Sequence, residues 1–253
     1  MRLKPGWYLL FATALYALLV TLAWRRCVHQ PPPPPEPREE AVAEPAPPPP
    51  PAPTKAEEPP PAYVLPLPGA CVPKDPDHLP NAPRDYRNGV SYGFVFTGDD
   101  ACVPVVYGTG VIASARGEVI KADHDHRPLS MEDFLKLLAE VRRGANPEQM
   151  DLLRGREVWI RHPDGLVSVY AHLSGIAPQV RVGARVRRGD WIGYVGNSGT
   201  ELEVRGTRHG ARLLFELWRG EVGRGSYFGK GLDAKAVRAR ARRFFERLPD
   251  QED

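Results

Sequence analysis

The sequence contains no block of basic charge. Its 34 lysine and arginine residues are nearly balanced by 31 aspartate and glutamate residues, and the formal net charge is +3. Proteins that bind nucleic acid through its phosphates need a clustered basic surface. We therefore predict that nucleic acid is not a partner of this chain.

Residues 25–62 almost lack large apolar side chains. Sixteen of the 29 prolines fall within residues 31–62, together with six acidic and two basic residues. Such a segment cannot bury enough apolar surface to offset the entropy lost on ordering. We predict a disordered, proline-rich linker over residues 25–62, stiff enough to act as a spacer.

Residues 7–24 contain no charged side chain and have Trp7 and Trp24 at their ends. A helix of this length, at about 1.5 Å per residue, nearly spans a bilayer core of about 30 Å. We predict a transmembrane anchor over residues 7–24, preceded by a short tail over residues 1–6. A cleaved signal peptide is the alternative, because Thr21-Leu22-Ala23 resembles a cleavage site, but the uncharged stretch is longer than a usual signal core.

The chain has only three cysteines. Cys71 and Cys102 bracket a segment rich in turns and glycine, which predicts a disulfide, with two unrelated buried thiols as the alternative. The basic residues on the two sides of the anchor are balanced, so they do not fix its orientation. The disulfide does indicate an orientation, because disulfides persist in oxidising compartments. We therefore expect a single-pass protein of the cell membrane whose C-terminal domain is extracytoplasmic. Cys27 receives no role.

Residues 63–253 have the patterns of a folded domain. Period-two runs predict short strands over residues 93–96, 105–107, 111–114, 118–122 and 213–218. Helical spacing of apolar residues predicts a helical insertion over about 128–154 and a C-terminal helix over about 233–248, with Ser130 and Asp233 as N-caps. The predicted fold class is a mainly β, antiparallel, β-sandwich-like domain with these helical additions.

The stretch from Gly165 to Thr200 is the centre of this domain. Alternation predicts a strand that places Ser168, Tyr170 and His172 on one face. Short strands separated by glycine are predicted to follow, beginning at the valines of residues 180, 182 and 186 and continuing through residues 191–195.

Three phrases, in this order, resemble the lysostaphin-type (LytM-like) zinc endopeptidases, which cut bacterial cell-wall peptides. They are YAHLS at residues 170–174, VGARVRRGDWIGYVG at residues 182–196 and LLFELW at residues 213–218. The resemblance covers about residues 79–248. It implies the fold of that family and allows the positions of the family's site to be assigned in this sequence.

The resemblance implies a zinc held by the histidine and aspartate of an H-x-G-[VI]-D segment and by the second histidine of an H-x-H pair. The first histidine of that pair and the histidine of the YAH phrase would handle the water and the transition-state charge. Here these positions hold Ser91, Val95, Leu214, Arg212 and His172, so only His172 is retained. A catalytic zinc needs three imidazole, carboxylate or thiolate donors and an open position. We predict a degenerate member with no catalytic residue, no metal and no cofactor.

A binding groove is predicted instead, lined by Tyr170, His172, Asn197 and Arg212. Arg212 would supply a fixed positive charge suited to a carboxylate. The alternative role for Arg212 is a surface salt bridge with Glu216, further along the same strand.

A displaced metal site is the weaker alternative. His124 and His126 alternate with Asp123 and Asp125, and the two histidines would share one face if the preceding strand continued. If this alternative held, zinc would be the cofactor. The other interpretation of the segment is a solvated loop.

Together these features predict a membrane-anchored, catalytically inactive LytM-like domain that binds cell-wall peptidoglycan or regulates a peptidoglycan hydrolase. The first alternative is an active zinc metalloendopeptidase that cleaves cross-link peptides with relocated ligands. The second is a structural scaffold of the cell envelope.

Overall fold

The structure is a computed structural model of the chain, and it describes residues 62–246. These residues belong to the unit Glu57–Asp253. The predicted tail and anchor, and the predicted linker up to residue 61, lie outside the described residues. Within residues 62–246, no helix combines the length and the apolar character needed to cross a bilayer.

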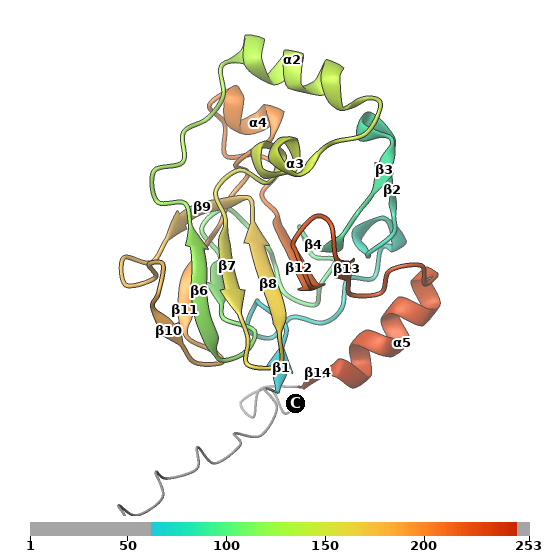
Figure 1. Ribbon diagram of the computed structural model, residues 1–253, viewed down its shortest axis with the longest axis vertical. Coiled ribbons are helices and arrows are strands. Elements are labelled where there is room, and N and C mark those ends of the chain that lie inside the picture. Colours follow the sequence, from blue (N-terminus) through green and yellow to red (C-terminus); the bar gives the residue numbers. More distant parts are fainter. Residues whose placement is uncertain (1–61, 247–253) are drawn as a thin grey trace, which may run out of the picture. The chain divides into compact units, whose positions relative to one another are not determined.

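The largest sheet in the described part of the chain has seven strands, and all of its pairs are antiparallel. Its order is β10-β6-β7-β8-β12-β13, and β4 also pairs with β12. The strands are β4 (Gly93–Phe96), β6 (Gly117–Ala122), β7 (Val158–Arg161), β8 (Leu166–Ala171), β10 (Arg185–Val186), β12 (Leu213–Arg219) and β13 (Ser226–Tyr227). Figure 1 shows β6, β7 and β8 side by side. The prediction of a mainly antiparallel β domain is confirmed.

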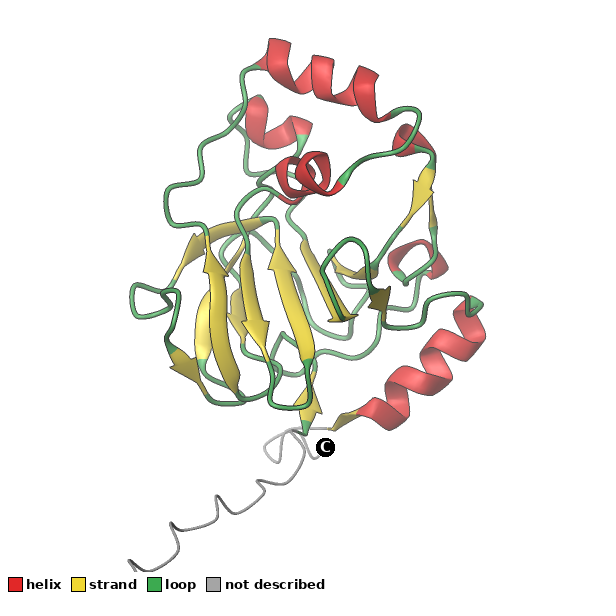
Figure 2. Cartoon of the chain, in the orientation of Figure 1, coloured by secondary structure: helices red, strands yellow, loops and turns green. Residues whose placement is uncertain are grey.

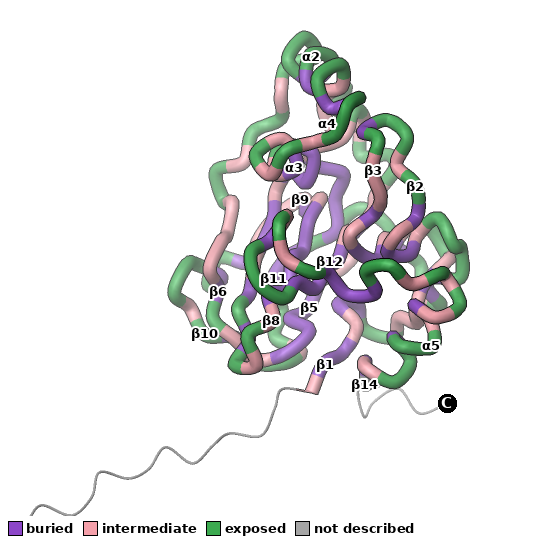
Figure 3. Tube along the Cα trace, turned by 45° about the vertical axis from the view of Figure 1, so that its right-hand side comes forward, coloured by how far each residue is buried: buried purple, intermediate pink, exposed green. Residues whose placement is uncertain are grey.

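A smaller sheet has the order β5-β11-β9 and shares its core with the larger one. Its strands are β5 (Gly110–Ile112), β9 (Leu173–Ile176) and β11 (Trp191–Val195). The shared cluster includes Val111 and Ile192 of the smaller sheet with Ile160 and Phe215 of the larger one. In Figure 3 the buried residues, drawn in purple, lie at the centre of the domain.

Two short strand pairs complete the β structure of the described residues. The hairpin strands β2 (Pro83–Arg84) and β3 (Gly89–Val90) are antiparallel. The strands β1 (Tyr63–Val64) and β14 (Phe245–Glu246) are parallel, and they join the two ends of the described segment.

Two predicted strands do not form. Residues 105–107 make only an isolated bridge between Val105 and Gly98, because Val106 and Tyr107 lie exposed in a turn. Val180 and Val182 also lie in turns, where the amide of Val180 donates to the carbonyl of Ala177 over 2.9 Å. Val182 is 68% exposed, so its alternation with Val180 does not reflect a strand.

The helices begin where the caps predict. Ser130 accepts a hydrogen bond from the amide of Asp133, and Asp233 accepts one from the amide of Ala236. The helical segments are α2 (Met131–Val141), α3 (Pro147–Arg154), α4 (Glu201–Val204), α5 (Ala234–Phe244) and the 3-10 turns η1 (Pro76–His78) and η2 (Asp85–Arg87). Helix α5 ends at Phe244, short of the predicted residue 248, because Phe245 adopts extended backbone and enters β14.

The predicted helical insertion lies beyond one end of the strands of the larger sheet, and not along its edge (Figure 2). Helices α2 and α3 pack against each other through Leu137, Val141, Met150 and Leu153. This placement brings the C-terminal end of α3 close to β8 and β12, where the candidate site lies.

The predicted disulfide between Cys71 and Cys102 is present and joins residues 31 positions apart. Closing a loop of this length stabilises the domain by about 3–4 kcal/mol in the chain-entropy account. It fixes the irregular N-terminal segment against the turn that follows β4.

Candidate functional site

A cavity of about 310 Å³ contains all five positions that the family resemblance assigns to the zinc site. Its lining includes Ser91, Val95, His172, Arg212 and Leu214. These residues come from three separated parts of the sequence. The structure therefore brings together the positions that sequence reasoning grouped.

The pairing of β4 with β12 explains much of this convergence. Val95 lies directly opposite Leu214, and Gly93 lies directly opposite Glu216. Because side chains alternate along a strand, the side chains of Val95, Leu214 and Glu216 face the cavity whereas Phe215 enters the core. A methyl group on Gly93 would lie 2.1 Å from the carbonyl oxygen of Phe215, so only glycine allows this close strand approach.

His172 follows β8 directly and has a left-handed backbone conformation, with φ of 63°. Its Nδ1 donates to the carbonyl oxygen of Ser198 over 2.7 Å, which leaves Nε2 as the nitrogen with a free lone pair. Burial and the neighbouring positive charge of Arg212 lower the pKa of His172 to about 4. The imidazole is therefore neutral at physiological pH.

A buried ion pair forms one wall of the cavity. Arg154, at the end of α3, donates to the Glu216 carboxylate of β12 over 2.8 Å, and both side chains are 1% exposed. The indole Nε1 of Trp218 donates to the same carboxylate over 2.7 Å. The alternative in which Arg212 pairs with Glu216 is therefore wrong, because Arg154 already occupies this carboxylate.

Arg212 has no carboxylate partner among the described residues. Its Nε donates to the backbone carbonyl of Gly210 over 3.1 Å, and burial lowers the pKa of its guanidinium. Two further arginines line the same cavity from the β2–β3 hairpin, Arg84 and Arg87. Neither was predicted from the sequence, although the close spacing of charged residues at Arg84, Asp85 and Arg87 was a possible signal.

Two of the predicted groove residues, Tyr170 and Asn197, do not line the cavity. Tyr170 is fully buried, and its hydroxyl accepts from the amide of Ser114 over 2.7 Å and contacts Ser168 Oγ at 3.1 Å. Ser168 and Tyr170 do share one face, but it is the core face of β8. His172 is not part of that row because its positive φ turns it away after the strand ends.

Asn197 has an anchoring role. Its side-chain nitrogen donates to the carbonyl oxygens of Thr207 and His209, over 2.8 and 3.0 Å. The residue is 3% exposed. It therefore holds the loop that precedes β12.

Ser91 is buried beside the cavity, and its hydroxyl donates to the carbonyl oxygen of Gly93 over 2.9 Å. Its backbone also pairs with Asn81 and Ala82. The side chain is thus engaged in holding the chain at the start of β4.

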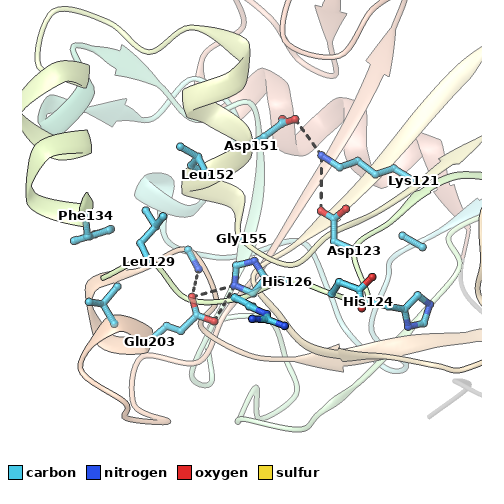
Figure 4. Close-up of a pocket in the computed structure, with 15 residues that line it drawn as sticks. Lys121, Asp123, His124, His126, Leu129, Phe134, Asp151, Leu152, Gly155 and Glu203 are labelled. Carbon is cyan, nitrogen blue, oxygen red and sulfur yellow. Dashed lines mark hydrogen bonds and ion pairs between the residues drawn. The ribbon is translucent and has the colours of Figure 1, made fainter. Parts of the chain in front are cut away.

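His124 and His126 line a second cavity, of about 410 Å³, shown in Figure 4. His126 Nε2 contacts the carboxylate of Glu203 at 3.0 Å, whereas His124 Nε2 donates to the carbonyl oxygen of Val180 over 2.7 Å. The two imidazoles have separate partners and do not converge. Within residues 62–246, no group of three or more histidine, cysteine, aspartate or glutamate side chains is placed to hold a metal ion.

Lys121 is the centre of a network of charges at this second cavity. Lys121 lies within 4 Å of three carboxylates, those of Asp123, Asp151 and Glu157. Burial raises the pKa of Glu157 to about 7, and the neighbouring Arg154 and Lys121 oppose this shift. Lys121 contacts the Glu157 carboxylate directly. In the first cavity, by contrast, Arg84, Arg87 and Arg212 have no carboxylate partner among the described residues.

Several solved structures are similar to this chain. A zinc-containing peptidase from Vibrio cholerae is 19% identical over 62% of this chain and 36% of its own, with a TM-score of 0.39. The catalytic domain of the antimicrobial peptidase lysostaphin from Staphylococcus simulans is 21% identical over 56% of this chain and 75% of its own, with a TM-score of 0.34. A chain of the SpoIIQ–SpoIIIAH pore-forming complex is 19% identical over 69% of this chain and 92% of its own, with a TM-score of 0.39.

No curated protein matches this chain. The sequence does match a known family, Peptidase family M23, over residues 100–226, which is about half of the chain. The smaller sheet, strands β6, β7, β8, β10 and β12 of the larger sheet, the YAH phrase and the LLFELW phrase fall within the matched segment. The chain therefore belongs to peptidase family M23.

Proposed function

We propose that the M23 domain of this chain is catalytically inactive and binds cell-wall peptidoglycan or a peptidoglycan hydrolase. The supporting observation is that Ser91, Val95, His172, Arg212 and Leu214 line one cavity. Ser91 and Val95 precede the segment matched by the family, so their roles rest on the sequence resemblance and on the register of β4 with β12.

The side chains of this cavity do not fit a catalytic zinc ion. Val95 and Leu214 meet as two hydrocarbon side chains across β4 and β12. The Arg212 guanidinium remains protonated and cannot donate a lone pair, and the Ser91 hydroxyl is bonded to Gly93. His172 is then the single imidazole at these positions, whereas a catalytic zinc needs three donors and an open site.

The same cavity is suited to binding. Val95 and Leu214 supply an apolar surface, His172 supplies a neutral ring nitrogen, and Arg212 supplies a positive charge. Such a combination recognises a polar ligand through a few directed groups set in an apolar lining. A peptide of the cell wall, or a segment of a wall hydrolase, has this character.

We further propose that the domain is extracytoplasmic and anchored through residues 7–24, with residues 25–62 as a spacer. The disulfide between Cys71 and Cys102 supports an oxidising compartment. In this arrangement the domain would reach the cell wall while it remains attached to the membrane.

The metal content of the purified chain tests the loss of zinc chemistry. We expect far less than one equivalent of zinc after purification without chelator, and no chelator-sensitive cleavage of wall fragments. About one tightly held zinc per chain, together with such cleavage, would favour the active peptidase with relocated ligands.

Binding is tested with isolated cell wall and with candidate wall amidases in a pull-down. We expect retention by one of them, and loss of retention in the pair of variants Arg212→Gln and His172→Asn. If neither is retained, and deletion within residues 31–62 affects cell shape or division more than the cavity variants do, the structural scaffold is the better interpretation.

A further inference from the structure

The cavity at β4 and β12 has an excess of positive charge that the described residues do not neutralise. Three arginines without an ion-pair partner line it: Arg84, Arg87 and Arg212. The carboxylates of the lining are those of Glu216, which is already paired with Arg154, and Asp77, which lies at the exposed rim. Three guanidinium groups therefore face one solvent-exposed carboxylate.

Neutral backbone carbonyls orient these guanidinium groups. Arg84 donates to the carbonyl oxygens of Pro83 and Asp77 over 2.8 and 2.9 Å, and Arg212 donates to that of Gly210. Arg87 donates to the carbonyl of Val90, and its Cζ lies 4.8 Å from the ring centroid of Tyr92. Carbonyls and an aromatic ring hold the cations in place without cancelling their charge.

Arg87 is held in the wall of the cavity although one of its donors is unsatisfied. The residue is 4% exposed, yet its Nε has no hydrogen-bond partner within the described part of the chain. A buried donor left without an acceptor is costly, so the fold holds Arg87 in this position at the expense of one hydrogen bond. The Nε atom has almost no exposed surface of its own, so a ligand in the cavity would contact Arg87 through other atoms of its side chain.

The arginines influence one another across the cavity. Burial lowers the pKa of Arg84, and the positive charges of Arg87 and Arg212 lower it further. Like charges held together in a partly desolvated cavity repel, so an anion placed between them would gain from all three at once. This arrangement favours a negatively charged ligand over a neutral one.

The rest of the lining narrows the chemistry of the ligand. Apolar and aromatic side chains also form part of the cavity wall: Val95, Leu214, Met150, Leu153, Tyr86 and Tyr92. A free phosphate would use the arginines and leave this wall uncovered. A peptide with a carboxylate would use both, because the planar carboxylate matches the guanidinium fork and the aliphatic remainder covers the apolar wall.

We propose that this cavity binds a carboxylate of a short peptide between Arg84, Arg87 and Arg212. The proposal rests on the proposed binding function and specifies its ligand as an acidic peptide. The free lone pair of His172 Nε2 would accept a hydrogen bond from a peptide N–H of the same ligand.

Calorimetric titration of the full chain with two matched peptides tests the proposal. The first is Ala-Glu-Ala with a free C-terminal carboxylate, and the second is Ala-Gln-Ala with a C-terminal amide. We expect the acidic peptide to bind at least about tenfold more tightly, because charge-assisted hydrogen bonds to arginine are lost in the second. Inorganic phosphate should bind at least about tenfold more weakly than the acidic peptide, since it lacks the apolar contacts.

Single substitutions locate the site. Arg84→Gln and Arg212→Gln should each weaken binding of the acidic peptide by about tenfold, and Arg212→Lys by less, because lysine keeps the charge but not the fork. The matched control is Arg224→Gln, which removes one exposed arginine that does not line the cavity and should leave the affinity unchanged. The melting temperature of each variant shows that the comparison is made between folded proteins.

Several results would overturn the proposal: equal affinity for the two peptides, phosphate binding as tight as that of the acidic peptide, or equal losses in the control and cavity variants. A chain that is retained by cell wall but does not distinguish the peptides leaves the proposed function standing and removes the arginine site. A chain that distinguishes the peptides but is retained by neither cell wall nor hydrolase leaves the arginine site standing and removes the proposed function.

Discussion

Arg154 and Glu216 form a buried ion pair between the last residue of α3 and the middle of β12, although 62 residues separate them in the sequence. The pair joins the helical insertion to the sheet at the wall of the cavity. Its carboxylate also accepts from the indole of Trp218, so both Glu216 oxygens have donors. The position of the insertion therefore depends on an electrostatic contact inside the domain.

Removing one partner of this pair should be strongly destabilising. Arg154→Met leaves the Glu216 carboxylate buried without its cation, which should lower the free energy of unfolding by about 3–5 kcal/mol in urea titrations. The double variant Arg154→Met with Glu216→Gln should recover part of this loss, because the glutamine is uncharged and still accepts from Trp218. The exposed pair of Arg224 and Glu221 is the control, and Arg224→Met should cost less than about 1 kcal/mol. Equal losses in the two single variants would contradict the prediction.

The close approach of β4 to β12 predicts a second effect. In Gly93→Ala the added methyl would meet the Phe215 carbonyl oxygen at 2.1 Å and Glu216 Cγ at 2.8 Å. The strands would have to separate, and we expect the free energy of unfolding to fall by about 1–3 kcal/mol. Gly175→Ala is the matched strand control, since its methyl would lie 3.7 Å from the ring of Tyr194. A Gly93→Ala chain as stable as the control would show that the strands can move apart freely.

His172 should make the domain less stable in mild acid. The unfolded chain protonates this imidazole near pH 6.5, whereas the folded chain does so only near pH 4, so the unfolded state binds more protons within this window. Stability should therefore fall as the pH drops from 6.5 to 4. Asparagine tolerates the left-handed backbone of this position, so His172→Asn should remain folded.

The measurement is urea unfolding at several pH values. The loss of stability between pH 6.5 and 4 should be smaller in His172→Asn than in the parent chain by about 1–3 kcal/mol. His209→Asn, at an exposed loop position, should leave the pH profile of the parent unchanged. If the profiles of the parent and His172→Asn coincide, His172 is not held in its neutral form by the fold.

Much of the fold follows from local sequence patterns. Alternation and glycine punctuation predicted the strands around β4, β6 and β12, and the caps at Ser130 and Asp233 predicted where helices begin. The parallel pairing of β1 with β14 could not be predicted, because it joins residues at opposite ends of the described segment. The strand predicted over residues 105–107 was wrong because the apolar side chains there lie in an exposed turn. Alternation alone does not distinguish such a turn from a strand.

The candidate site was predictable in part. The family phrases identified His172, Arg212 and Leu214, and the structure places them in one cavity. Tyr170 was wrongly included because alternation was extended through a residue whose φ is positive. The pairing of Arg154 with Glu216 was missed because no local pattern links a helix end to a strand so far along the chain. A charged residue in the middle of an otherwise apolar core strand was nevertheless a signal that Glu216 has a buried partner.

Restoring donors at the family positions should restore metal binding. The variant has four substitutions, Ser91→His, Val95→Asp, Arg212→His and Leu214→His. Positions 95 and 214 are direct partners across β4 and β12, and all four positions line the cavity that also contains His172. Replacing Arg212 also removes the cation that would repel a metal ion. We expect about one zinc per chain in this variant, because three donors of the required type would converge.

The control for this experiment keeps Leu214 and has the other three substitutions, so it lacks one donor. Its zinc affinity, measured by competition with a chromophoric chelator, should be much weaker than that of the full variant. Zinc uptake in the full variant alone would support the assignment of these positions and would locate the loss of zinc chemistry in the side chains. A folded full variant that takes up no zinc would contradict the assignment, because the backbone at β4 and β12 would then not hold the donors around one point.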